Sequence, residues 1–245
     1  MDNPTHRVLQ PIIQVKDLSF AYKKENWILK DVSFSIQPGE IVAIAGQSGI
    51  GKTTMGFILK GLIPHTIKGK LKGSIQVAGW DVKKTKIVKL AKAIGMVFQD
   101  LNSQLFSTSV QEEVEFGLRN LKLNLEWGLE AMEFLGIANL RERMPMNLSA
   151  GQKQRVILAA IIATHPKVLI LDEPSAHLDK ISKIGLKNLL MKLNHEYGTT
   201  ILIIEQDPWI LGEMCQSILH VEDCTIRRTD KNRLLEKKPQ WSWKT

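Results

Sequence analysis

A glycine-rich segment, GQSGIGKT at residues 46–53, places a lysine and a threonine after three glycines. It matches the pattern G-x-x-x-x-G-K-[ST] and lies between an apolar run and a segment with helical periodicity. Glycines let a backbone wrap around an anion, and the start of a helix adds partial positive charge. Lys52 would reach the outer phosphates of a nucleotide, and Thr53 would offer a hydroxyl to Mg²⁺. The residues expected to bind the nucleotide here are Gly46, Gln47, Ser48, Gly49, Ile50, Gly51, Lys52, Thr53 and Thr54.

Two acidic residues, Asp172 and Glu173, end a second apolar run, VLILDE. Carboxylates at the end of a buried strand are costly unless a cation or a hydrogen-bond donor meets them. We expect Asp172 to hold Mg²⁺ and Glu173 to activate the water that attacks the terminal phosphate. Taken alone, the pair is equally consistent with a helix-capping acid or a surface ion pair. Together with the glycine-rich segment, it predicts hydrolysis of the nucleotide.

The elements around these residues alternate between strands and helices. Helical periodicity dominates from about 109 to 164, beginning with Ser109 and Glu112 at the spacing of a capping box. The architecture expected is therefore α/β with a helical insertion. Strands are expected at 12–20, 32–36, 41–46, 73–80, 94–100, 167–173 and 199–207, and further helices at 52–62, 86–93 and 181–198.

Composition limits the classes of protein that fit. A chain of 245 residues with 44% hydrophobic content can bury one large core or two smaller ones. Cys215 and Cys224 fit no metal spacing and no disulfide framework, so free thiols in a reducing, cytosolic compartment are expected. The longest apolar run, 156–163, is far shorter than the roughly 20 residues that span a bilayer, and no signal peptide is recognisable. The net charge of +8 is carried by scattered lysines, which favours a solvated surface over a nucleic-acid groove.

The segment 147–179 carries a further motif, LSAGQ, in which Ser149 can cap a helix whose exposed amides attract anions. This segment resembles the ATP-binding subunits of ABC transporters, and the resemblance covers residues 12–228. It implies the fold of a P-loop NTPase ABC cassette with a RecA-like parallel-sheet core, an N-terminal antiparallel β subdomain and a helical subdomain at about 102–165. A polar tail, 229–245, follows, in which Trp241 and Trp243 would dock on the body or on a partner, or stay loosely held.

The resemblance also implies roles for single residues. Each ATP would lie between the loop of one chain and the signature of a second cassette, either a paralogue or another copy. Tyr22 would stack on adenine, Gln99 would contact Mg²⁺ and sense the membrane partner, and Asp179 would communicate across the dimer. The alternatives are a packed strand aromatic, a polar strand end and an N-cap. The signature residues are Leu148, Ser149, Ala150, Gly151 and Gln152.

The segments 98–118 and 61–65 are similar to the subunits of energy-coupling factor importers, which take up vitamins or transition-metal ions. That similarity implies a transmembrane coupling subunit, a substrate-binding membrane subunit, and a peripheral place on the cytoplasmic face of the membrane. The helix that begins near Ser109 would border a groove for the coupling subunit. Its apolar residues either line this groove or form core of the helical insertion; they are Val110, Val114, Phe116 and Leu118.

Gln206 stands where the family has a histidine, after the last core strand. His177, His195 and His220 are not in register to replace it. A glutamine amide can donate a hydrogen bond but cannot become a cation or relay a proton near neutral pH. Loss of such a group commonly slows hydrolysis by about 10²- to 10³-fold, so we expect slow turnover at this chain's own loop. The alternatives are a glutamine that works well enough and an engineered substitution.

The function that these residues favour is that of an ATP-hydrolysing motor subunit of an importer. A soluble ABC ATPase acting on nucleic acid or ribosomes is compatible with the basic charge. That class usually carries long coiled-coil insertions or two cassettes in one chain, and this sequence has neither. A P-loop kinase would leave the signature segment unexplained. No residue in the sequence selects a cargo.

Overall fold

A computed structural model of the chain describes residues 10–24, 26–176 and 178–229. Its central layer is a six-stranded sheet with the strand order β10-β9-β3-β8-β7-β6. The strands pair in parallel except for β10, which runs antiparallel to β9 at the edge. The strands of this sheet are β3 (Ile41–Ala45), β6 (Ile94–Val97), β7 (Val168–Asp172), β8 (Thr200–Ile204), β9 (Ser217–Glu222) and β10 (Thr225–Thr229).

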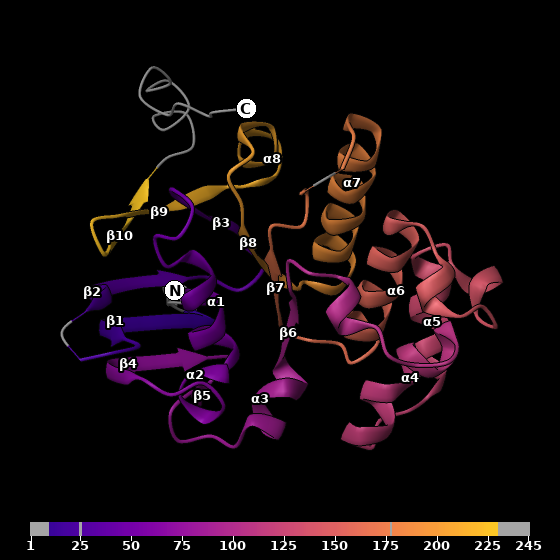
Figure 1. Cartoon of the computed structure of the whole chain (residues 1–245), viewed down its shortest axis with the longest axis horizontal. Coiled ribbons are helices and arrows are strands. Elements are labelled where there is room, and N and C mark those ends of the chain that lie inside the picture. Colours follow the sequence, from indigo (N-terminus) through magenta and orange to yellow (C-terminus); the bar gives the residue numbers. More distant parts are fainter. Residues whose placement is uncertain (1–9, 25, 177, 230–245) are drawn as a thin grey trace, which may run out of the picture.

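A second, antiparallel sheet has the order β2-β1-β4-β5 and packs beside the first. Its strands are β1 (Ile13–Ala21), β2 (Trp27–Ile36), β4 (Lys70–Val77) and β5 (Trp80–Asp81). Strand β2 begins five residues before the expected 32–36 run, because Trp27 and Leu29 already pair with the end of β1. Figure 1 shows this sheet beside α1 (Lys52–Lys60) and α2 (Leu62–His65), on the opposite side of the molecule from the helical insertion.

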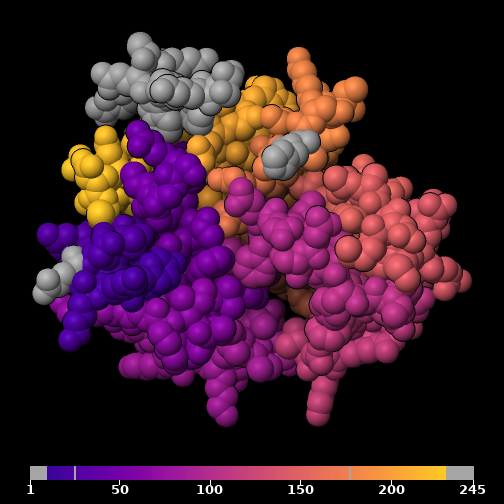
Figure 2. Space-filling model, in the orientation of Figure 1, coloured from indigo at the N-terminus to yellow at the C-terminus, as the bar shows by residue number. Residues whose placement is uncertain are grey.

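The remaining helices are α3 (Ile87–Ala93), α4 (Val110–Leu121), α5 (Glu126–Phe134), α6 (Ala150–Ile162), α7 (Lys180–Tyr197) and α8 (Pro208–Met214), with short 3₁₀ turns at 102–104, 138–140 and 145–147. Of these helices, α3 packs in the core that α1 and the antiparallel sheet share, and α4 to α8 pack in the other core. Figure 2 shows the antiparallel sheet and the helical insertion as separate lobes with a hollow between them.

The parallel strands are buried on both faces, which explains their continuous apolar runs. Along β3, Ile41 and Ala43 face a core shared with α4 to α8, whereas Val42 and Ile44 face a core shared with α1 and the antiparallel sheet. Successive side chains of a strand point to opposite faces, so one sheet joins the two cores. The predicted fold class is therefore confirmed: an α/β core, an antiparallel sheet near the amino end and a helical insertion.

The start of α4 differs from the predicted capping box. Ser109 does cap the helix, because its hydroxyl accepts the amide of Glu112 at 3.2 Å. The carboxylate of Glu112, however, accepts the amide and hydroxyl of Thr108, at 3.3 and 2.5 Å, rather than the amide of Ser109. Thr108 lies one residue earlier and offers two donors, so it captures the carboxylate.

Two further expectations concern membranes and the tail. Within residues 10–24, 26–176 and 178–229, no helix combines the length and apolar content needed to cross a bilayer. Trp241 and Trp243, predicted to dock or to stay loosely held, lie outside the described residues.

The double burial of the parallel sheet makes a quantitative prediction. Leu202 in β8 is fully buried, so Leu202→Ala leaves a cavity and should lower the free energy of unfolding by about 2–5 kcal/mol. Leu129→Ala is the matched control, because Leu129 in α5 is 45% exposed and the change should cost less than about 1 kcal/mol. Urea unfolding followed by far-UV circular dichroism measures both values. Equal losses for the two variants would contradict the assignment of β8 to the centre of the core.

Candidate functional site

The glycine-rich segment forms a loop between β3 and α1. Gly49 and Gly51 have φ values of 76° and 109°, which residues with a side chain rarely adopt. A Cβ on Gly51 would also lie 2.7 Å from a methyl of Ile28 in β2. Lys52 folds back over the loop, and its Nζ donates to the carbonyls of Gly46 and Gln47 at 2.9 and 2.8 Å. The loop therefore wraps around one cation at the start of a helix.

Lys52 is only 4% exposed. Burial lowers the pKa of its ammonium, and the negative charges of Glu173, Asp172 and Glu205 oppose that shift. These three carboxylates come from the ends of β7 and β8, so the lysine is the cation that faces them. Because the loop and the carboxylates share this lysine, they form one site.

Asp172 meets the first turn of α1. Its Oδ1 accepts the hydroxyl of Thr53 at 3.2 Å, and burial raises the pKa of this carboxyl to about 6, while the Thr53 bond opposes the rise. A hydroxyl and a carboxylate are both oxygen ligands of the kind Mg²⁺ prefers. Among the residues that the structure describes, no cluster of three histidine, cysteine or acidic side chains could hold a metal alone. A magnesium ion here would therefore need further oxygens from a nucleotide.

Glu173 is held from both sides. Its Oε2 accepts the amide of Gln99 at 2.7 Å, and its Oε1 accepts the amide of Gln206 at 3.2 Å. The strand order β8-β7-β6 explains this, because Gln206 and Gln99 each follow a neighbour of β7 by two residues. Glu173 itself has a φ of 48°, a conformation that is unfavourable for a residue with a side chain. Its backbone amide is fixed by the carbonyl of Ile204 at 2.8 Å.

The signature residues lie at the start of α6. The hydroxyl of Ser149 accepts the amide of Gln152 at 3.4 Å, and the side chain of Gln152 accepts the amide of Ser149 at 3.1 Å, which makes a full capping box. Ala150 and Gly151 are exposed, whereas Leu148 is buried. A Cβ on Gly151 would meet nothing within 4 Å. The amino-terminal end of α6 is thus preorganised by its capping box, and there is free space beside Gly151.

A cavity of about 440 Å³ separates this helix from the carboxylates, and Ala150, Gln99 and Glu173 contribute to its walls. Gln154, which the sequence analysis missed, crosses the same region: its amide donates to the carbonyl of Pro174 at 2.7 Å. It lies one helical turn after Ala150, so helical periodicity from the signature would have pointed to it.

A second link joins α6 to the segment after β6. The ammonium of Lys153 donates to the side-chain oxygen of Asn102 at 2.9 Å. Since Gln99 lies in that same segment, α6 is connected both to the segment that follows Glu173 and to the one that carries Gln99.

Other residues named from the sequence have different partners or positions. Tyr22 is 44% exposed, and its hydroxyl shares a hydrogen bond with Thr54 at 3.0 Å. Asp179 caps α7 by accepting the amide of Ser182 at 2.7 Å, as the N-cap alternative predicted. His195 lies in α7 and His220 in β9, so neither is at the end of β8. His177 lies outside the described residues.

Lys52, Thr53, Asp172, Glu173, Gln99 and Gln206 are thus brought together at one edge of the sheet. Of the signature residues, Ala150 lines the same cavity as Gln99, Asp172 and Glu173. Within the described part of the chain, no signature residue forms a hydrogen bond with residues 46–53.

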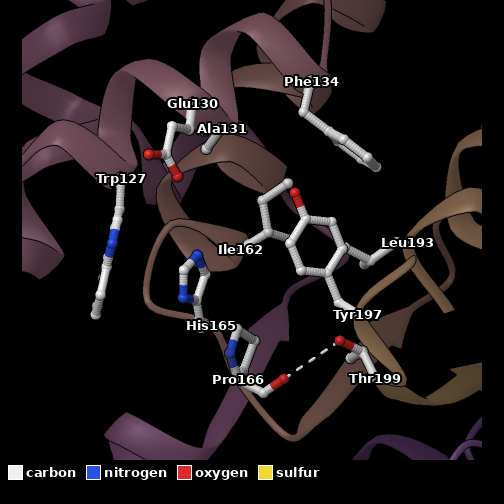
Figure 3. Close-up of a pocket in the computed structure, with 10 residues that line it drawn as sticks. All are labelled: Trp127, Glu130, Ala131, Phe134, Ile162, His165, Pro166, Leu193, Tyr197 and Thr199. Carbon is white, nitrogen blue, oxygen red and sulfur yellow. Dashed lines mark hydrogen bonds between the residues drawn. The ribbon is translucent and has the colours of Figure 1, made fainter. Parts of the chain in front are cut away.

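A separate hollow of about 280 Å³ lies between α5, the end of α6 and the end of α7 (Figure 3). Trp127 stacks on His165 with ring centroids 4.4 Å apart, and Phe134 meets Tyr197 edge to face at 5.6 Å. None of the residues expected to bind a nucleotide lines it. These rings join the helical insertion to the core.

Comparisons with known proteins identify the family of the chain. The sequence pattern of the family described as ABC transporter matches residues 29–176. An ABC transporter ATP-binding protein of Pyrococcus horikoshii is 36% identical over 238 residues, which are 94% of this chain and 80% of that protein. A counterpart from Pyrococcus abyssi is 37% identical over 216 residues, 85% of this chain and 76% of that protein.

A relative from Caldanaerobacter subterraneus subsp. tengcongensis is 40% identical over 201 residues, 80% of this chain. The chain spans only 35% of the length of that relative. These relatives therefore share the matched region but differ in total length.

Solved structures share the fold. One is cbiO1 from Clostridium perfringens, described as part of the ABC transporter complex cbiONQ, with a TM-score of 0.83 and 32% identity over 93% of this chain and 92% of that one. Another is a dimeric ATP-binding cassette in a post-hydrolysis state bound to ADP and Pi, with a TM-score of 0.76 and 26% identity over 89% of this chain and 98% of that one. The resemblance predicted from the signature segment is confirmed, and the chain belongs to the ABC transporter family as one of its ATP-binding cassettes.

Proposed function

We propose that the chain binds MgATP and hydrolyses it as the motor subunit of an importer of the energy-coupling factor type, which takes up a vitamin or a transition-metal ion. The single observation that carries the hydrolysis is the carboxylate of Glu173, held by Gln99 and Gln206 beside Asp172 and the phosphate loop. The likeness to cbiO1, part of the complex cbiONQ, supports the importer type. The cargo would be selected by membrane subunits.

The loop and α1 would bind the triphosphate. Backbone amides of residues 46–53 would bind the phosphates at the positive end of the helix. Lys52 would exchange its two carbonyl partners for phosphate oxygens. Tyr22 would receive the adenine, because Thr54 holds its hydroxyl next to the loop while the ring stays partly exposed. A ring held in this way presents a flat apolar face to a base.

Magnesium would be held by Thr53 and Asp172, with the amide oxygen of Gln99 nearby. When bound, the ion would neutralise charge on the phosphate oxygens. Glu173 would accept a proton from water as the water oxygen bonds to the terminal phosphorus, and the bond from that phosphorus to the bridging oxygen of ADP would break. The products would be ADP and inorganic phosphate. Gln99 and Gln206 would orient the carboxylate by donating to its two oxygens.

A second cassette, a paralogue or another copy, would complete each site. The capped and exposed start of α6 offers Ser149 and Gly151 to an anion, yet these residues do not contact their own loop. The signature of one chain would therefore contact the ATP held by the other. Asp179, the N-cap of α7, would lie between the two chains.

The membrane partner would dock near the start of α4. Phe106 and Phe116 are 63% and 49% exposed and meet edge to face at 4.7 Å. The amide of Val110 bonds to the carbonyl of Arg143 at 2.9 Å, which brings the exposed Met144 and Met146 close to this helix end. Val110, Val114 and Leu118 are fully buried, so these three belong to the core of the insertion. An exposed aromatic pair of this kind suits a helix of a transmembrane coupling subunit, which would place the chain peripherally on the cytoplasmic face.

Glu173→Gln tests the assignment of the base. The variant keeps the shape of the side chain but cannot accept a proton, so ATP hydrolysis should fall by about 10²- to 10⁴-fold while ATP still binds. Steady-state phosphate release and binding of a fluorescent ATP analogue measure the two properties. Glu142→Gln, a change on an exposed side chain of the helical insertion, is the control and should leave both unchanged. Full activity of Glu173→Gln would refute the proposed base.

Gln206→His tests the missing imidazole. Because histidine can relay a proton and carry charge, the variant should hydrolyse ATP at least about 10-fold faster than the chain with Gln206. Gln206→Ala removes the amide that contacts Glu173 and should be slower than the chain with Gln206. The three single-turnover rates, measured with saturating ATP, decide the point. If the histidine variant is no faster, the hypothesis that Gln206 causes slow hydrolysis is contradicted.

The raised pKa of Asp172 predicts a dependence of binding on pH. Protons and Mg²⁺ compete for this carboxylate, so MgATP affinity should be constant above about pH 7 and should weaken as the pH falls through about 6. The asparagine side chain of the Asp172→Asn variant cannot ionise. Its MgATP affinity should therefore vary with pH only as far as titration of the nucleotide itself requires. Titrations of both proteins at pH 5, 6 and 7.5 measure the difference. Identical pH profiles for the two proteins would contradict the role of Asp172.

A further inference from the structure

The turn that follows β8 is organised by a buried carboxylate. Glu205 is 5% exposed, and its Oε1 accepts the backbone amides of Gln206 and Asp207 at 2.7 and 3.1 Å. Its Oε2 accepts the hydroxyl of Ser175 at 2.5 Å. A carboxylate buried away from water is costly unless donors satisfy it, and here three donors do so.

Ser175 belongs to the neighbouring turn that follows Glu173. It is 4% exposed, and its carbonyl accepts the amide of Leu178 at 3.1 Å. The amide of Ala176 bonds to the carbonyl of Glu173 at 3.1 Å. The bond from Ser175 to Glu205 therefore joins the turn that carries Glu173 to the turn that carries Gln206.

The far end of the second turn is fixed as well. Asp207 caps α8 by accepting the amide of Trp209 at 2.8 Å, and it pairs with the ammonium of Lys183 in α7. Between these anchors, the side-chain amide of Gln206 reaches Glu173 at 3.2 Å. The position of this amide depends on the backbone that Glu205 holds.

We propose that Glu205 is a positioning residue for hydrolysis: its carboxylate fixes the two turns together and thereby holds the amide of Gln206 on Glu173. This inference rests on the proposed function. Among the described residues, the carboxylate of Glu205 forms hydrogen bonds with Ser175, Gln206 and Asp207, not with the phosphate loop or Thr53, so it would act through Gln206. Its effect should appear in kcat and not in the KM for ATP.

An electrostatic role is the competing explanation. The charge of Glu205 also opposes the effect that burial has on the pKa of Lys52, although Glu173 and Asp172 contribute more. The two roles respond in opposite ways to two substitutions. Glutamine keeps the length of the side chain and removes the charge, and it can still accept the two amides and donate to Ser175. Aspartate keeps the charge but is one methylene too short to bridge the two turns.

The decisive experiment measures kcat and KM for Glu205→Gln and Glu205→Asp in the assembled cassette dimer. Positioning predicts that Glu205→Asp lowers kcat by about 10- to 100-fold with KM little changed, while Glu205→Gln stays within about 3-fold of the natural chain. In a Gln206→Ala background, Glu205→Asp should cause no further loss, because the amide that it positions is absent. A larger loss of kcat in Glu205→Gln than in Glu205→Asp, equal losses of kcat in both, or no loss in either would overturn the proposal. A full additional loss in the Gln206→Ala background would also overturn it.

Glu113→Asp is the matched control. Glu113 is also 5% exposed, and its carboxylate accepts the backbone amides of Phe106 and Ser107, both at 2.9 Å. The same shortening there should leave kcat unchanged within about 2-fold.

A second readout does not need hydrolysis. Amide hydrogen exchange of Gln206 and Asp207 should be faster in Glu205→Asp than in Glu205→Gln, and equal exchange in the two would overturn the proposal. A failure of the proposed function looks different, because Glu173→Gln would then hydrolyse ATP as well as the natural chain does.

Discussion

The carboxylates at the ends of β7 and β8, of which Asp172 and Glu205 are buried, can lie close together only because hydrogen-bond donors meet them. Asp172 accepts a hydrogen bond from the hydroxyl of Thr53, and Glu173 accepts hydrogen bonds from two glutamine amides. Glu205 accepts hydrogen bonds from a serine hydroxyl and two backbone amides. Lys52 supplies the positive charge that faces all three. An unpaired charge in such a place would cost several kcal/mol. The site is therefore stable only when the loop, the strand ends and the turns are all in place.

The strand order sets this arrangement. Because β7 lies between β8 and β6, the residues that follow its two neighbours arrive on either side of Glu173. Parallel strands place their carboxyl ends at one edge, which is where open α/β sheets bind ligands. The backbone of Glu173 has a φ of 48°, an unfavourable conformation of the kind that persists only where the surrounding structure determines it.

Two side-chain hydrogen bonds connect α6 of the helical insertion to this edge of the sheet. Gln154 reaches Pro174, which directly follows Glu173, and Lys153 reaches Asn102, which lies three residues after Gln99. A shift of α6 would therefore act on both sides of the Glu173 carboxylate. The signature lies at the start of this same helix. Under the proposed function, this helix would provide a route from a partner cassette to Glu173.

The sequence predicted the elements and the single residues better than the bonds between them. The glycine pattern, the apolar runs and the acidic pair are local signals, and the structure brings Lys52, Asp172 and Glu173 together. The hydrogen bonds from Gln99 and Gln206 to Glu173 were not predicted, because they depend on the order of three strands that are far apart in the chain. The roles expected for the signature and for Tyr22 stay predictions, since they concern a nucleotide and a second chain.

The central claim is that the loop and the carboxylate edge form one MgATP site. Equilibrium dialysis of the chain against labelled ATP, with Mg²⁺ or with EDTA, tests it most directly. The account predicts saturable binding of one ATP per chain that weakens when Mg²⁺ is removed and is lost in Lys52→Ala. Saturable binding that persists undiminished in Lys52→Ala, or no saturable binding at all, would contradict it.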